Sequence, residues 1–170
     1  GSNGFRFYRQ FNEFGLRGKI AVVGGMTAFD EAVLRNMGDE ALGIVTACWY
    51  SADVENVINK RFAANFRGGW GYDPGFYAAA TYVEAAVLEA ALQKIDGKIE
   101  DKRAFMKAVR SVKVDTARGP VAFDHLGNVV GSVYIRKVER KDGRLVNRVI
   151  HTYPNVSQFW TYKEAEFLKN

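Results

Sequence analysis

The sequence contains few residues whose type and spacing could carry out covalent chemistry. His125 and His151 fall in different predicted elements, and neither has a cysteine or carboxylate partner at the spacing of a metal site. Cys48 is the one cysteine, so no intramolecular disulfide can form, and its apolar surroundings favour a buried structural thiol. Asp124 and Asp142 are explained by turns. We therefore expect neither a catalytic group nor a metal site.

The sequence also lacks the motifs that bind common cofactors. It has no Gly-x-Ser-x-Gly elbow, no phosphate-binding loop and no full dinucleotide fingerprint. We therefore expect no cofactor and no enzymatic activity, with an α/β enzyme of unknown reaction left as an alternative.

A glycine-rich turn is the first stretch that could bind a small molecule. Gly24-Gly25-Met26-Thr27 follows Lys19 to Gly24, which is apolar enough to predict a buried strand. In open α/β sheets, the loops after such strands line the ligand crevice. The alternative is an ordinary turn, in which Met26 fills the core and Thr27, with Asp30 three residues later, caps the next helix.

A long apolar helix, Gly71 to Gly97, is the second such stretch. Asp73 can cap its start, Pro74 suits the first helical position, and Gly97 can take the left-handed conformation that ends a helix. Its apolar residues lie on nearly every side, so the helix must be covered broadly. The aromatic residues around its start are Trp70, Tyr72, Phe76 and Tyr77.

The remaining pattern predicts an α/β fold. Before residue 51, two helices (Gly4 to Phe14 and Phe29 to Met37) alternate with two strands (Lys19 to Gly24 and Leu42 to Tyr50), which predicts a parallel sheet flanked by helices. Three helices then follow without a strand between them, marked by residues 54–66, 71–97 and 104–112. We expect these helices to lie on a sheet that this chain lacks, rather than to form a bundle. A short strand, Val121 to Phe123, and a hairpin of Ser132 to Arg140 and Leu145 to Thr152, joined at Asp142-Gly143, end the pattern. We expect aromatic residues in the tail after the hairpin to pin it to the surface.

Composition is that of one ordinary globular domain. The chain has 170 residues, of which 48% are hydrophobic and 25% charged, and its net charge of +5 is spread without a long basic run. The basic residues of the hairpin suit a solvated face, so no nucleic acid is expected as a partner. No secretory leader begins at Gly1, and the chain opens inside a helix-like pattern, which suggests a fragment.

Five segments in order resemble a known family. They are residues 18–25 (GKIAVVGG), 38–53 (GDEALGIVTACWYSAD), 73–92 (DPGFYAAATYVEAAVLEAAL), 117–138 (ARGPVAFDHLGNVVGSVYIRKV) and 151–160 (HTYPNVSQFW). Together they resemble the C-terminal half of periplasmic substrate-binding proteins of ABC transporters, of the branched-chain amino acid (leucine/isoleucine/valine) type. The resemblance implies the type I periplasmic binding protein fold, a three-layer parallel-sheet sandwich in two lobes that close by a hinge motion.

The resemblance also implies how the chain divides between the two lobes. Residues 1–50 would be a second-lobe α/β segment, residues 51–131 a first-lobe helical segment, and residues 132–170 the return to the second lobe as hairpin and tail. The first-lobe sheet of the family would precede Gly1. We therefore expect the apolar faces to be covered by that N-terminal half, retained as a separate chain, or by a second copy.

The family pattern assigns a role to the glycine-rich turn. Its amino-acid-binding members carry a glutamate at the position of Met26, which pairs with the ammonium group of the ligand. A thioether cannot replace that charge, and burying an unpaired ammonium group is costly. We therefore expect a small organic acid, in particular an aromatic carboxylate. Asp39 and Glu40 are the nearest acids, and we interpret them as solvated turn residues. An amino acid stays the alternative if residues before Gly1 supply an acid.

Tyr77 matches the family position where an aromatic ring packs on the ligand, although a core or interface ring is the alternative. The expected ligand-binding residues are thus Tyr77, Met26, Gly25 and Thr27. The expected function is that of a periplasmic, or otherwise extracytoplasmic, component that presents its ligand to an ABC permease complex. A ligand-sensing regulatory domain of the same fold is the alternative.

Overall fold

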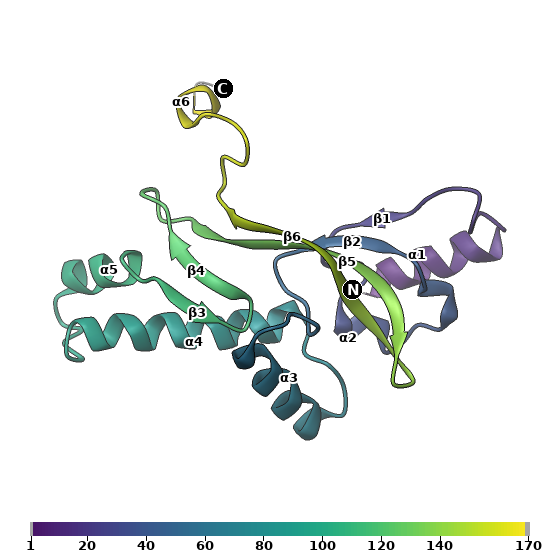
Figure 1. The fold of residues 1–170 in the computed structure, drawn as a ribbon, viewed down its shortest axis with the longest axis horizontal. Coiled ribbons are helices and arrows are strands. Elements are labelled where there is room, and N and C mark those ends of the chain that lie inside the picture. Colours follow the sequence, from purple (N-terminus) through teal and green to yellow (C-terminus); the bar gives the residue numbers. More distant parts are fainter. Residues whose placement is uncertain (1, 169–170) are drawn as a thin grey trace.

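The computed structural model describes residues 2–168. Two groups of elements lie at opposite ends of a long hairpin formed by β5 (Val129–Lys141) and β6 (Arg144–Val156), as Figure 1 shows. One group contains α1 (Ser2–Glu13), β1 (Val23–Gly24), α2 (Glu31–Leu34), the 3-10 turn η1 (Asp39–Ala41) and β2 (Val45–Cys48). The other contains α4 (Phe76–Lys94), α5 (Lys102–Arg110), β3 (Val114–Thr116) and β4 (Gly119–Phe123), with α3 (Val57–Trp70) between the two groups.

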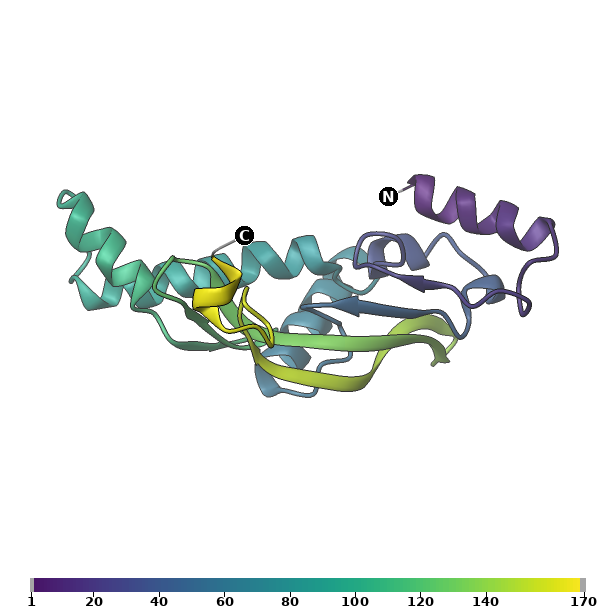
Figure 2. The ribbon, with the colours of Figure 1, turned by 90° about the horizontal axis from the view of Figure 1, so that it is seen from above.

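The strands form one mixed sheet. Its order is β1-β2-β5-β4-β3, and β6 pairs with β5. The predicted parallel pairing occurs between β1 and β2, whereas β2 runs antiparallel to β5, with Cys48 opposite Tyr134. The other pairs are also antiparallel, because hairpins rather than helical crossovers connect them. Figure 2 shows α4 lying along one face of this sheet.

The first strand and the second helix are shorter than predicted. Only Val23 and Gly24 of the predicted buried strand pair with a neighbour, and the Val23 side chain is 78% exposed because β1 lies at the edge of the sheet. The second helix begins at Glu31, with Asp30 rather than Thr27 at its N-cap position. The capping box predicted for Thr27 and Asp30 is therefore wrong, since the Asp30 side chain bonds to another helix.

The helices that were predicted to lie on a sheet absent from this chain pack, on one side, against strands at one end of the chain's own sheet. The third helix ends at Arg110, and the chain then forms β3, which pairs with β4 in a hairpin that the sequence pattern did not indicate. A core joins this hairpin to α4 and α5, made of Val83, Val87, Ala91, Ala108, Val112 and Val121. The far side of α4 stays open at Tyr77 and Leu88. Among residues 2–168, no helix combines the length and apolarity that a membrane crossing needs.

The hairpin turn is confirmed. Asp142 and Gly143 both have positive φ, 50° and 77°, as a tight turn between two strands requires. The tail, with α6 (Glu164–Phe167), folds against the loop after β4, where Gln158 Nε2 donates to Asp124 Oδ2 at 2.8 Å. Phe159 is buried there, whereas Trp160 is half exposed. The expected aromatic pinning thus holds for part of the tail.

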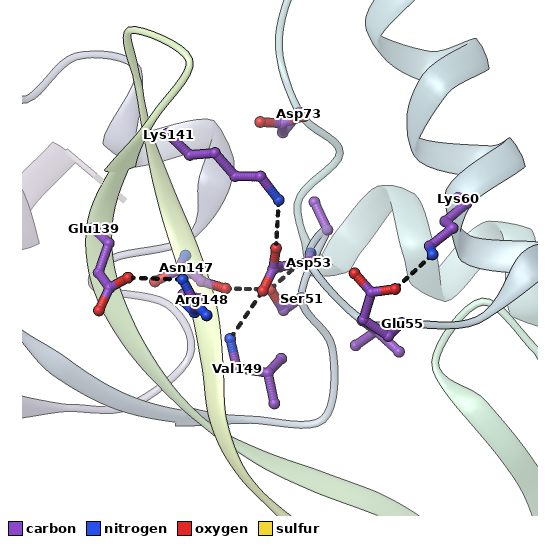
Figure 3. Close-up of polar contacts among 12 residues, drawn as sticks. Ser51, Asp53, Glu55, Lys60, Asp73, Glu139, Lys141, Asn147, Arg148 and Val149 are labelled. Carbon is purple, nitrogen blue, oxygen red and sulfur yellow. Dashed lines mark hydrogen bonds and ion pairs between the residues drawn. The ribbon is translucent and has the colours of Figure 1, made fainter.

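The segment between β2 and α3 is bonded to the hairpin, as Figure 3 shows. Ser51 Oγ donates to the carbonyl oxygen of Asn147 at 2.5 Å. The Asp53 carboxylate accepts hydrogen bonds from Lys141 Nζ and from the backbone N–H of Val149, both at 3.3 Å. This crossing between the two groups of elements is therefore fixed by side-chain and backbone contacts.

Candidate functional site

The candidate site lies where the two parallel strands end. Because β1 and β2 run in the same direction, the residues that follow them, Met26 and Trp49, leave the same edge of the sheet. Both side chains are half-buried and pack against one apolar cluster that includes Phe76 at the start of α4. Gly25 and Thr27, the other two expected residues of the loop, are exposed.

Asp30 holds this loop beside α4. Its Oδ1 accepts a hydrogen bond from the backbone N–H of Phe76 at 3.0 Å, and the side chain is only 5% exposed. A carboxylate at this position satisfies a free amide at the helix start and interacts favourably with the helix dipole. Gly75 leaves room for it, since a Cβ there would lie 2.8 Å from Asp30 Cγ.

Asp73 does not cap α4, although the sequence predicted that it would. Its carboxylate is buried and binds two arginines, Arg67 through Nε at 2.8 Å and Arg144 through Nη1 at 2.6 Å. These two guanidinium groups compete successfully with the helix amides for the carboxylate, because each adds opposite charge. The prediction for Gly97 is confirmed: it has φ 74° just beyond the helix.

The aromatic row is our name for Trp49, Phe76 and Tyr77. The ring centroids of Trp49 and Phe76 are 6.0 Å apart at 81°, and those of Phe76 and Tyr77 are 4.2 Å apart. Tyr77 is 74% exposed, so its ring and hydroxyl are open to a ligand. The structure thus brings Met26 and the start of α4 into one cluster, with Tyr77 at its open edge. Whether these residues contact a ligand stays a prediction.

Arg118 also belongs to this surface, and the sequence analysis did not single it out. Its Cζ lies 4.6 Å from the centre of the Trp49 ring. The side chain is half-buried, and this burial lowers the pKa of the guanidinium below its ordinary value. Arginine nevertheless stays a cation in proteins at neutral pH. The available signal was a lone arginine in the apolar stretch from Ala117 to Phe123; its contact with Trp49, 69 positions earlier in the chain, could not be read from the sequence.

Asp39, Glu40 and His125, which lie outside this surface, have structural partners. Asp39 is exposed and pairs with Arg140, and Glu40 Oε1 accepts from the N–H of Gly38 at 2.9 Å, which fits the interpretation as turn residues. His125 lies 3.0 Å from Glu164 on the surface. Within residues 2–168, no group of three potential ligands could hold a metal ion.

Cys48 is buried, as predicted. Burial raises the pKa of its thiol, so the reactive thiolate is disfavoured. This agrees with a structural role for the side chain.

A cavity of about 640 Å³ lies elsewhere, between the crossing segment and the hairpin. None of Met26, Gly25, Thr27 and Tyr77 lines it. Its charged lining residues are paired with one another or with a neighbour: Lys141 with Asp53 at 3.3 Å, Arg148 with Glu139 at 3.6 Å, and Glu55 with Lys60 at 2.5 Å. Because these charges are already neutralised, we place the candidate site at the aromatic row and not in this cavity.

Comparison with known proteins identifies the family and the fold. Residues 1–144 match the family described as periplasmic binding protein. A solute-binding protein of an ABC transporter from Rhodopseudomonas palustris BisB5, solved with 3,4-dihydroxybenzoic acid, superimposes with a TM-score of 0.84 and 37% sequence identity over 91% of this chain and 43% of that one. Another from R. palustris, solved with 4-hydroxybenzoate, gives a TM-score of 0.81 and 28% identity over the same shares.

A curated relative points to the amino acid branch. The Leu/Ile/Val-binding protein homolog 6 of Brucella abortus is 25% identical over 160 residues, which is 90% of this chain and 40% of that protein. The chain therefore spans well under half the length of the relatives it matches. The matches place it in the type I periplasmic binding protein fold.

Proposed function

The chain belongs to the periplasmic binding protein family, and on this premise we propose that it is part of the extracytoplasmic solute-binding component of an ABC uptake transporter. The component would capture a small organic acid between two lobes and present it to the permease. Closure would favour the bound state only through contacts that the ligand gains in the closed form. No covalent step is needed for this function.

The proposed ligand is an aromatic carboxylate. The observation that carries this choice is the aromatic character of the surface: Met26 packs beside Trp49 and Phe76, and Tyr77 offers an open ring. Such rings bind a flat apolar ligand by stacking and edge contacts. Two similar proteins from R. palustris, solved with 3,4-dihydroxybenzoic acid and 4-hydroxybenzoate, support the same ligand class.

The nearby acids do not supply a partner for the ammonium group of an amino acid. Asp30 follows the loop, but it is buried and its Oδ1 bonds to Phe76 N. Asp73 is committed to Arg67 and Arg144. An amino acid ligand would therefore need its acidic partner from residues outside this chain, which is the alternative that the Brucella relative favours.

We also propose that the chain contributes to both lobes, with residues 51–131 in the first and residues 1–50 and 132–170 in the second. The crossing at Ser51 to Asn56 and the long strand β5 would be two of the connections between them. The open side of α4 would then face first-lobe residues that precede this chain in the protein, or a second copy.

Isothermal titration calorimetry tests the ligand class. The protein expressed from its complete coding sequence is titrated with 4-hydroxybenzoate, benzoate and leucine in separate experiments. We expect binding of at least one aromatic carboxylate and none of leucine. Tight binding of leucine, with no binding of aromatic carboxylates, would contradict the proposal.

A further inference from the structure

Arg118 is a half-buried cation without an anionic partner among the residues that the structure describes. None of their ion pairs includes it, and the groups that act electrostatically on its charge are Tyr134 and Cys48 rather than carboxylates. Its Nη2 donates to the carbonyl oxygen of Ser132 at 3.2 Å, and its buried Nε has no hydrogen-bond partner. A guanidinium that has lost water without gaining an anion is costly unless another molecule supplies one.

The guanidinium is held in one place. The ring of Trp49 covers one part of it at 4.6 Å. Gly131 leaves the space for it, because a Cβ at Gly131 would lie 3.0 Å from Nη2 and 3.4 Å from Cζ. Cation–π stacking against tryptophan suits the planar guanidinium and leaves its edge available for hydrogen bonds.

The turn that carries Arg118 is also fixed. Tyr134 Oη donates to the Arg118 carbonyl oxygen at 2.8 Å, and Thr116 Oγ1 accepts from the Arg118 N–H at 3.2 Å. Asn56 Nδ2, from the crossing segment, donates to the carbonyl oxygens of Thr116 and Ala117 at 3.3 and 3.2 Å. A group positioned in this way can bind an anion with little loss of conformational freedom.

We propose that Arg118 binds the carboxylate of the ligand while Trp49 and Tyr77, the accessible members of the aromatic row, contact its ring. The inference rests on the proposed function and assigns the charge-binding group within it. The charge sits next to Trp49, and the row continues from Trp49 through Phe76 to Tyr77. This order places a cation at one end of an aromatic surface, which matches an aromatic ring with one carboxylate. A guanidinium can bind a carboxylate with two parallel hydrogen bonds.

The test compares an acid with its neutral amide. Calorimetry on the complete protein measures the affinities for 4-hydroxybenzoate and 4-hydroxybenzamide in the wild type, Arg118→Gln and Arg118→Lys. We expect Arg118→Gln to weaken binding of the acid by about 10- to 100-fold and to change the affinity for the amide little. Arg118→Lys should reduce the affinity for the acid less than Arg118→Gln does, because lysine keeps the charge although it lacks the planar contacts of the guanidinium.

A second variant keeps Arg118 in the sequence but displaces its guanidinium group. Gly131→Ala should displace the guanidinium and reduce the affinity for the acid more than that for the amide. Arg61→Gln is the matched control, since Arg61 is an exposed arginine on α3. It should leave both affinities unchanged. Thermal unfolding of each variant verifies that it is folded.

The outcomes separate the inference from the function. If Arg118→Gln weakens the acid and the amide equally, or weakens neither, Arg118 only supports Trp49 and the turn, and the inference is wrong. If the wild-type protein binds no aromatic carboxylate, the proposed function fails first and the inference fails with it. A selective loss of affinity for the acid supports both.

Discussion

The carboxylate of Asp30 caps the helix that begins at Phe76, 46 residues later in the chain, through a hydrogen bond of 3.0 Å. This bond joins the segment after β1, which carries Met26, to the start of α4, which carries Tyr77. The two stretches that the sequence indicated as ligand-binding are therefore held beside each other by one buried side chain. The geometry of the candidate site depends on this contact.

We predict that Asp30→Ala lowers both stability and ligand affinity. Loss of a helix cap costs about 1 kcal/mol, and the freed loop no longer holds Met26 against the aromatic row. Asp30→Asn should lower stability and affinity less than Asp30→Ala does, because an amide oxygen can still accept a hydrogen bond from Phe76 N. Urea denaturation and calorimetry on the same samples give the two quantities. Unchanged stability in Asp30→Ala would show that this cap is not formed in solution.

We predict that Met26→Glu weakens binding of an aromatic carboxylate. A carboxylate in the loop after β1 repels an anionic ligand and also takes charge into the half-buried cluster around Phe76. Met26→Gln is the control, since it has a similar length without the charge. The ratio of the two variants' affinities for 4-hydroxybenzoate is the measurement. Equal affinities would mean that residue 26 lies away from the ligand.

We predict a pH-dependent stability that originates at Glu31. Burial raises the pKa of this side chain to about 8 from 4.5, and nearby Arg136 only partly offsets the effect. A carboxyl group with a raised pKa binds its proton more tightly in the folded state, so its contribution is fully present below pH 4.5. It is lost as the pH rises toward about 8, and the free energy of unfolding falls over this window.

Glu31→Gln isolates that contribution. The amide stays neutral and can still accept the hydrogen bond that Glu31 Oε1 receives from the N–H of Ala52 at 3.2 Å. The free energy of unfolding is measured by urea denaturation at pH 5 and pH 8 in both proteins. The wild type should lose more stability than the variant between these two values. A parallel change in both would assign the pH dependence to other groups.

We predict that Arg136→Ala is strongly destabilising. Arg136 is fully buried, donates to Tyr50 O at 2.8 Å and to Thr46 Oγ1 at 3.1 Å, and lies 3.6 Å from Glu31. Removing its side chain withdraws the donor from two buried acceptors, and each acceptor left unsatisfied costs about 1–3 kcal/mol. Lys137→Ala on the adjacent, partly exposed position should cost less than about 1 kcal/mol. Similar losses in the two variants would contradict the buried network.

Local signals in the sequence predicted much of the architecture. The residue types at Asp142-Gly143 and Gly97 indicated a turn and a helix end, because they tolerate the positive φ that these positions have. The parallel pairing of β1 with β2 was predicted because a helical segment lies between two apolar runs, and a helical crossover lets both strands run in the same direction. Such features depend on neighbours in the chain, so the sequence pattern contains them.

The features that the sequence did not predict depend on contacts between residues far apart in the chain. The sequence indicated Asp73 as the cap of α4, and only the positions of Arg67, Arg144 and Phe76 in space show that Asp30 caps this helix instead. The hairpin of β3 and β4 was missed for the same reason: its short strand β3 is stabilised by pairing with β4 and not by a pattern of its own.

Native mass spectrometry tests the central claim most directly. The complete protein is incubated with equal concentrations of 4-hydroxybenzoate, benzoate, leucine, isoleucine and valine, and the mass of the intact complex is measured. The account predicts an added mass equal to one aromatic carboxylate. An added mass equal to one of the three amino acids, with no aromatic complex, would contradict it.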